Sequence, residues 1–114
     1  MKYSKTFEVK GDIGKAFELT QSYASGMKFT TENAIKPSML ILKRGSILPY
    51  FTSLIGNIEN LKTTLTISFT QKGEQLHVLC NYDVKGFLTI FTSSDKSTLE
   101  SEVENLKHHL EIAL

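Results

Sequence analysis

The sequence predicts an α+β fold in two layers: a curved antiparallel sheet of about six strands, in the order β-α-β5-α, with the C-terminal helix packed on it. Three observations support this fold class. Several segments alternate apolar and polar residues, which is typical of half-buried strands. Two segments instead repeat their apolar residues every three to four positions, as amphipathic helices do. Short turns join most of the strands, and short connections make neighbouring strands antiparallel.

The first strand and the first helix are expected near the start of the chain. Residues 3–9 alternate apolar and polar side chains, which indicates a strand with one buried face. Asp12 can then cap a helix, because a short acidic side chain accepts hydrogen bonds from the free N–H groups of a first turn. Gly26 follows the last apolar positions of this helix and is expected to supply a positive-φ stop.

Two hairpins are expected in the middle of the chain. Strands near residues 28–35 and 39–44 flank Lys36-Pro37-Ser38, a turn whose proline cannot continue a ladder of hydrogen bonds. Residues 64–70 alternate again and lead into the tight turn Lys72-Gly73-Glu74. One face of the strand that follows carries Leu76, Val78, Cys80 and Tyr82, and the other carries His77, Leu79, Asn81 and Asp83.

The last two elements are expected to be a central strand and a long helix. Phe87 to Phe91 is apolar on both sides apart from Thr89, as suits a strand within a sheet. Ser97 and Glu100 have the spacing of a capping box that opens a helix. A narrow apolar stripe along this helix is expected to close the core, and it consists of Leu99, Val103, Leu106, Leu110 and Ala113.

Size and charge limit the kinds of function. A chain of 114 residues forms one domain, 1–114, on ordinary size grounds. Its formal net charge is only +1, so no overall field draws it to nucleic acid, and no nucleic-acid partner is expected. The single cysteine, Cys80, cannot form an internal disulfide, which favours a cytoplasmic location. No apolar run approaches the roughly 20 residues of a transmembrane helix.

The most unusual stretch is an apolar connection between two strands, from Gly45 to Asn60. Connections normally lie at the surface and are polar, so apolar residues here must cover something. Three roles are open for Ile47 to Ile58: a plug that closes the end of the sheet, a lid over an apolar pocket, or a patch that docks a partner. Pro49 and Gly56 stand where proline opens and glycine ends a short helix.

The element order, together with the stretch KRGSILPY followed by NLKTTLTISF, resembles the helix-grip class, which includes START-like and pollen-allergen-like folds. This resemblance implies a curved antiparallel sheet that grips a long C-terminal helix. It also implies that the space between them holds an apolar ligand. It implies no shared catalytic residue, so we expect no enzyme activity, no cofactor and no bound metal.

The expected function is therefore the binding of an apolar small molecule or lipid-like ligand between the sheet and the last helix. The alternative is a protein-interaction module that self-associates, as a homo-oligomer, or docks a partner through Ile47 to Ile58. The residues expected to line the ligand space, with the first two at its mouth, are Tyr50, Phe51, Leu65, Ile67, Phe69, Phe91, Leu106 and Leu110.

Other candidate sites favour structural interpretations. Cys80 shares a strand face with apolar residues and is expected to be inert. Glu104, His108 and Glu111 share a helix face, which is more typical of a solvated surface than of a metal site. Lys43-Arg44-Gly45-Ser46 ends a strand with two cations that could seat a phosphate or carboxylate, or simply blunt the strand end.

Overall fold

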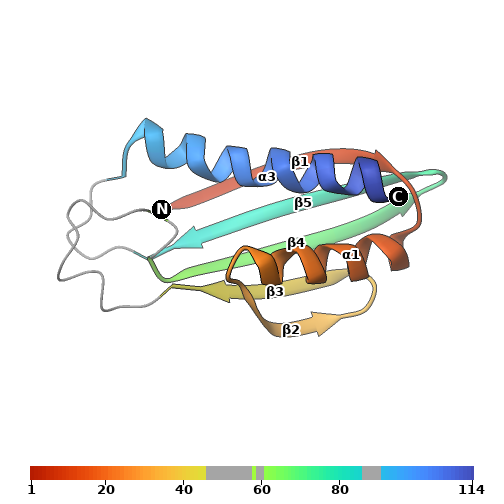
Figure 1. Cartoon of the computed structure of the whole chain (residues 1–114), viewed down its shortest axis with the longest axis horizontal. Helices are drawn as coiled ribbons and strands as arrows, with labels where there is room; N and C mark the ends of the chain where they lie inside the picture. Colours follow the sequence, from red (N-terminus) through yellow and green to blue (C-terminus); the bar gives the residue numbers. More distant parts are fainter. Residues whose placement is uncertain (46–57, 59–60, 86–90) are drawn as a thin grey trace.

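The computed structural model describes residues 1–45, 58, 61–85 and 91–114, which form a five-stranded sheet with two helices on one face (Figure 1). The strands lie in the order β1-β5-β4-β3-β2, and every neighbouring pair is antiparallel. The elements in chain order are β1 (Lys2–Lys10), α1 (Ile13–Gly26), β2 (Thr30–Ile35), β3 (Met39–Arg44), β4 (Thr63–Lys72), β5 (Gln75–Val84) and α3 (Ser93–Ala113).

The predicted α+β fold, with the C-terminal helix packed on an antiparallel sheet, is confirmed. The described part of the chain has five strands rather than about six. The strand expected at Phe87 to Phe91 falls mainly on residues 86–90, which lie outside the described residues, and Phe91 itself is not in a strand. Neither helix of the described part is long and apolar enough to cross a membrane.

The first helix begins as expected but ends differently. The Asp12 carboxylate accepts a hydrogen bond of 3.0 Å from the backbone N–H of Lys15, which satisfies one free donor of the first turn. Gly26 is the last helical residue and does not supply the positive-φ stop. That conformation falls two residues later, on Lys28 (φ 69°), because the N–H groups of Met27 and Lys28 still bond back to the last turn of α1.

The last helix begins earlier than predicted. Thr92 is its N-cap and forms a capping box with Asp95, so the expected box of Ser97 and Glu100 is wrong and Ser97 lies within the helix. Thr92 and Asp95 have the same three-residue spacing, a hydroxyl followed by a carboxylate, and they lie five residues earlier in the sequence. The earlier cap gives α3 a length of 21 residues.

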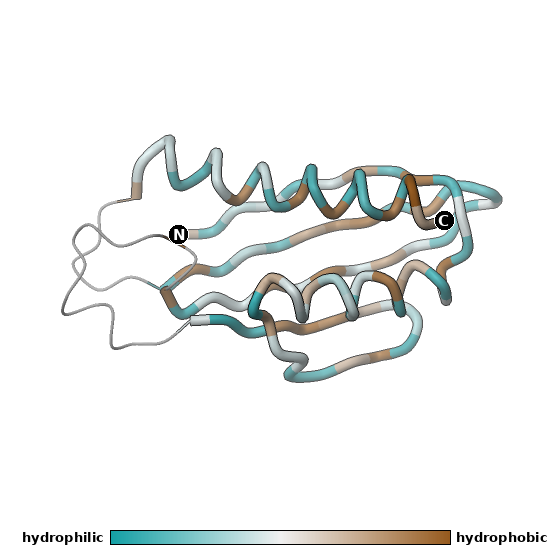
Figure 2. The backbone as a smooth tube through the Cα atoms, viewed as in Figure 1, coloured by the Kyte–Doolittle hydropathy of each residue, from teal (hydrophilic) through white to brown (hydrophobic). Residues whose placement is uncertain are grey.

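The core lies between the two helices and the inner face of the sheet. α3 runs along β1, while α1 lies over β3 and β4 and also contacts α3. Figure 2 shows that hydrophobic positions recur along α3 between hydrophilic ones, as the stripe requires. The stripe is confirmed, because Leu99, Val103, Leu106 and Leu110 are all buried, whereas Ala113 at its end is half-buried.

The inner face also agrees with the alternation in the sequence. On β4, Leu65, Ile67 and Phe69 are buried and the residues between them are half-buried. The turn between β4 and β5 is tight, since Lys72 pairs directly with Gln75 in the ladder. On β5 the buried residues are Leu76, Val78, Cys80, Tyr82 and Val84.

Leu106 tests the packing of α3 on the sheet. Its 2% exposure predicts that Leu106→Ala costs about 2 to 5 kcal/mol of unfolding free energy, because the change removes buried apolar surface and leaves a cavity. Urea denaturation of both proteins measures the difference. Ile112→Ala on the same helix is the control, because Ile112 is 71% exposed and its loss should change stability little. Equal effects for the two substitutions would contradict this packing.

Candidate functional site

A charged residue lies on the inner face of the sheet at the end of β3. Arg44 follows Leu40 and Leu42 at two-residue steps, so its side chain points to the same face as theirs. Only 5% of the Arg44 side chain is exposed. A buried guanidinium is costly unless other groups satisfy it, so its surroundings show what this end of the sheet can do.

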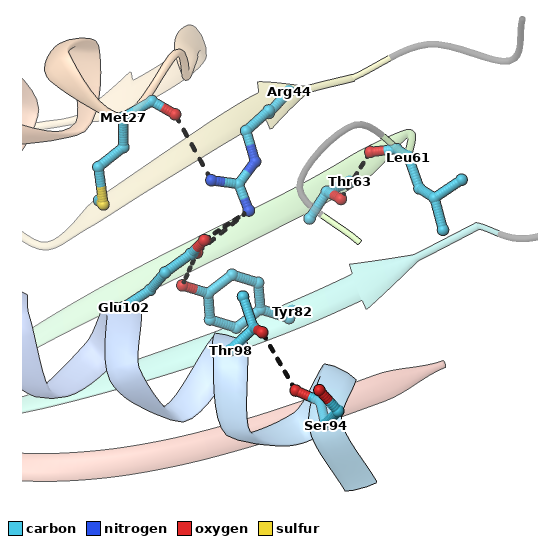
Figure 3. A network of polar contacts seen from close by, with 8 residues as sticks. All are labelled: Met27, Arg44, Leu61, Thr63, Tyr82, Ser94, Thr98 and Glu102. Atoms are coloured by element: carbon cyan, nitrogen blue, oxygen red, sulfur yellow. Dashed lines mark hydrogen bonds and ion pairs between the residues drawn. The ribbon is translucent and has the colours of Figure 1, made fainter. Parts of the chain in front are cut away.

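Glu102 of α3 provides the counter-charge for Arg44 (Figure 3). The Nη2 group of Arg44 lies 3.0 Å from Oε2 and 3.1 Å from Oε1 of Glu102, whose side chain is 13% exposed. The Nη1 group donates to the backbone carbonyl of Met27 at 3.4 Å. The guanidinium carbon also lies 4.2 Å from the centre of the Phe29 ring, which allows a cation–π interaction.

Tyr82 of β5 completes the cluster. Its hydroxyl donates a hydrogen bond of 2.9 Å to Oε1 of Glu102. Burial raises the pKa of the Tyr82 phenol, and the charge of Glu102 and this hydrogen bond raise it further. Tyr82 therefore remains a neutral donor in the physiological pH range. Glu102 receives hydrogen bonds from both Arg44 and Tyr82, which links β3, β5 and α3.

One donor in this cluster has no partner among the residues that the structure describes. Within 1–45, 58, 61–85 and 91–114, the buried Nε atom of Arg44 makes no hydrogen bond, although a guanidinium carries five N–H donors in a fixed plane. Unsatisfied buried donors are rare, because leaving one unpaired costs roughly 1 to 3 kcal/mol. Thr63, which pairs with Arg44 across β3 and β4, donates its hydroxyl to the carbonyl of Leu61 at 2.8 Å.

The expected ligand residues divide between two parts of the core. Leu65 pairs with Tyr82 in the β4–β5 ladder and therefore lies at the polar cluster, and Leu106 is one turn beyond Glu102 on α3. Phe69 packs instead on Phe17 of α1, with ring centres 6.1 Å apart.

The remaining expected residues complete this description. Ile67 and Leu110 are fully buried in the common core, and Phe91 is half-buried against it. Tyr50 and Phe51 lie outside the described residues. The same is true of the rest of the Ile47 to Ile58 segment up to residue 57. Its last residue, Ile58, is 3% exposed and belongs to the core.

The sequence indicated only part of this site. It marked Arg44 as a cation at a strand end that could seat a carboxylate, and the carboxylate it contacts belongs to Glu102 of the same chain. Glu102 was missed, although its place three residues after Leu99 and four before Leu106 puts it beside the apolar stripe. Lys43 faces the opposite side of the sheet and pairs with Glu32 at 2.9 Å.

The other candidate residues have structural surroundings. Cys80 is 1% exposed, and burial raises the pKa of its thiol to about 12, so little reactive thiolate forms near neutral pH. Glu104 lies 2.8 Å from the Nζ atom of Lys5 in a surface ion pair. Within residues 1–45, 58, 61–85 and 91–114, no three His, Cys, Asp or Glu side chains converge in a way that would hold a metal ion.

Solved structures share this architecture despite very different sequences. The Aha1 dimer from Colwellia psychrerythraea aligns with a TM-score of 0.66 and 11% identity, over 98% of this chain and 97% of that one. A conserved protein from Geobacillus kaustophilus aligns with a TM-score of 0.65 and 10% identity, over 97% and 93%. A START superfamily protein from Mycobacterium smegmatis aligns with a TM-score of 0.56 and 15% identity, over 96% and 94%.

These comparisons concern the fold. They confirm the START-like, helix-grip fold that the element order indicated, with similarity over nearly the whole chain. No family model and no curated protein matches the sequence. Function must therefore be argued from the residues of the site itself.

Arg44→Met tests whether the ion pair is a buried one. The substitution leaves Glu102 without its counter-charge, so we expect a loss of about 3 to 5 kcal/mol in unfolding free energy. Lys43→Met is the matched control, because it removes the neighbouring cation from an exposed pair and should cost at most about 1 kcal/mol. Adding Glu102→Leu to Arg44→Met should recover most of the loss in urea denaturation. A loss below that of the control would contradict the burial of this pair.

Cys80 is expected to react slowly with alkylating reagents in the native protein. Both its burial and its raised pKa reduce the amount of accessible thiolate, and denaturation removes both effects. The measurement is the rate of labelling by iodoacetamide, followed by mass spectrometry with and without urea. Native labelling as fast as that of the unfolded chain would show that the thiol is accessible.

Proposed function

We propose that this chain is a non-enzymatic binding domain for a lipid-like small molecule. The ligand lies between the sheet and α3, with its apolar body against Leu65 and Leu106 and a polar acceptor group at Arg44. The observation that carries the proposal is the buried Nε donor of Arg44, for which the described part of the chain supplies no hydrogen-bond partner. A carboxylate, carbonyl or hydroxyl oxygen of a ligand would satisfy it.

The composition of the region supports this proposal. Small-molecule sites are mostly apolar and contain a few fixed polar groups that orient the ligand. Here the polar groups come from three elements and contact one another. Glu102 forms an ion pair with Arg44, and the Tyr82 hydroxyl donates a hydrogen bond to Glu102. Such a cluster recognises an acceptor with little reorganisation, because its side chains are already ordered.

The full proposed site combines residues of both layers. Ile67, Phe69 and Leu110 extend its apolar wall, and Phe91, Tyr50 and Phe51 are proposed at its mouth. We extend the proposal to a cytoplasmic location, because the chain has a single cysteine, and to the absence of a nucleic-acid partner, because the net charge is only +1. The proposed role requires no cofactor.

The test compares two probes that share a tail and differ in the head group. Dodecanoate carries a carboxylate and dodecane carries none, so the expected result is a higher Tm with dodecanoate and a much smaller shift with dodecane. Native mass spectrometry of freshly purified protein looks for a co-purifying molecule in parallel. Equal shifts with both probes would remove Arg44 from the proposed site.

A triple variant separates recognition from folding. Arg44→Met with Glu102→Leu and Tyr82→Phe replaces the whole cluster by apolar groups, a change that is often neutral or stabilising for a buried ion pair. We expect this variant to fold and to lose at least tenfold in affinity for dodecanoate. Lys43→Met controls for the loss of a positive charge nearby. Unchanged dodecanoate binding by a folded triple variant would overturn the proposal.

Self-association through Ile47 to Ile58 is the second candidate function. The dimeric state named for the Colwellia psychrerythraea protein supports considering it. For a docking patch, Phe51→Ser with Leu54→Ser should abolish association in light scattering while Tm stays nearly constant. For a plug, the same double change should lower stability by several kcal/mol, since buried apolar groups are lost.

A further inference from the structure

On the face of the sheet away from the helices, residues at equal distances on either side of a central line across the strands have complementary chemistry. The residues of this face alternate with the core positions on each strand, and they are exposed on β1 and mostly half-buried on the inner strands. We call this surface the outer face. It consists of Lys2, Ser4, Thr6 and Glu8 of β1, His77, Leu79, Asn81 and Asp83 of β5, Thr64, Thr66, Ser68 and Thr70 of β4, and Met39, Ile41 and Lys43 of β3.

The strand register gives the outer face a midline. Lys5, Cys80, Ile67 and Leu40 are directly paired across four strands, which makes them one row perpendicular to the strands. Positions at equal distances on either side of this row are chemically complementary, apart from Lys43 at the end of β3, which pairs with Glu32 of its own chain. On β1, Lys2 lies three residues to one side of the row and Glu8 three residues to the other.

The same relation holds on the other strands. Asp83 and His77 lie three residues to either side of Cys80 on β5, so an acid again stands opposite a base. On β3, Ile41 and Met39 flank Leu40, which matches one apolar side chain with another. A rotation of 180° about an axis along the midline would therefore bring these paired groups over one another on a second copy.

The shape of the outer face is also complementary about this midline. On one side there is a hollow of about 320 Å³, lined by the short side chains of Ser4, Thr64, Thr66 and Asn81, with Lys2 and Asp83 at its end. On the other side lies Leu79, which is half-buried and is the apolar one of the two β5 residues next to the midline. Leu79 and Asn81 each lie one residue from Cys80, so the rotation places Leu79 of one copy over the hollow of the other.

We propose that a second copy of this chain packs against the outer face around this two-fold axis. Leu79 of each copy enters the hollow of the other, Lys2 of each faces the second copy's Glu8, and Asp83 faces the second copy's His77. Two sheets pack in this way with their strands within about 30° of each other and about 10 Å apart, a gap that long charged side chains can bridge. The proposal is independent of the ligand site.

The size of the outer face sets the expected strength of the dimer. Four strands at about 4.8 Å spacing and about seven residues at about 3.4 Å rise give roughly 500 Å² on each copy, or about 1,000 Å² in total. This is the lower end of specific interfaces, so a reversible and weak dimer is expected. The existing contacts within one copy, between His77 Nδ1 and Glu8 at 3.2 Å and between Lys85 Nζ and Asp83 at 3.3 Å, lie at the rim and can rearrange on association.

Sedimentation velocity of the full chain over a range of concentrations tests the proposal. The wild type is expected to shift from monomer to dimer as concentration rises. Leu79→Lys puts a charge where the hollow needs an apolar group and should weaken the dimer at least tenfold. Glu8→Lys opposes two lysines at each end and should also weaken it, whereas Lys2→Glu combined with Glu8→Lys should restore it.

The matched control is Glu18→Lys on α1. It makes the same charge change and also breaks one surface ion pair, with Lys36, but lies on the helical side of the molecule and should leave the dimer unchanged. If Leu79→Lys does not fold, Glu8→Lys and the double variant Lys2→Glu with Glu8→Lys still test the proposed dimer. A monomer at every concentration, or a dimer that tolerates both Leu79→Lys and Glu8→Lys, would overturn the proposal.

Discussion

The packing of α3 on the inner face of the sheet is the contact on which the rest of this structure depends. Its apolar stripe closes the core, and the same helix brings Glu102 to Arg44. The two effects are coupled. Apolar burial provides the driving force that holds the helix in place, and the buried ion pair is tolerable only while the helix keeps the two charges together. A shift of α3 by one turn would separate them.

The alternation of the strands then gives the sheet two different surfaces. Residues on one face are buried against α1 and α3, and those on the other are Thr, Ser and a few apolar or charged side chains. Because the side-chain period of a strand is two, neither surface can change register without disturbing the other. The proposed ligand site uses the inner surface and the proposed dimer uses the outer one, so the two activities can be altered separately by mutation.

Much of the fold was predictable because its signals are local. Alternation identified both faces of β5, the helical stripe identified the buried residues of α3, and Lys72-Gly73-Glu74 identified a tight turn. The helix ends were less predictable. Thr92 and Ser97 can both cap a helix, and the choice between them depends on how far α3 extends along β1. The positive-φ residue after α1 was likewise expected at Gly26, but it is Lys28.

The sequence by itself determined which residues are apolar and at what period, and this was enough for the layers, the core and the inert environment of Cys80. Only the tertiary structure decided how Arg44 is used. Arg44 and Glu102 are 58 residues apart, so no local pattern relates them, and a cation at a strand end is usually exposed. The fold places them on facing layers, where burial makes each charge require the other and where no other described residue accepts a hydrogen bond from the Nε donor of Arg44.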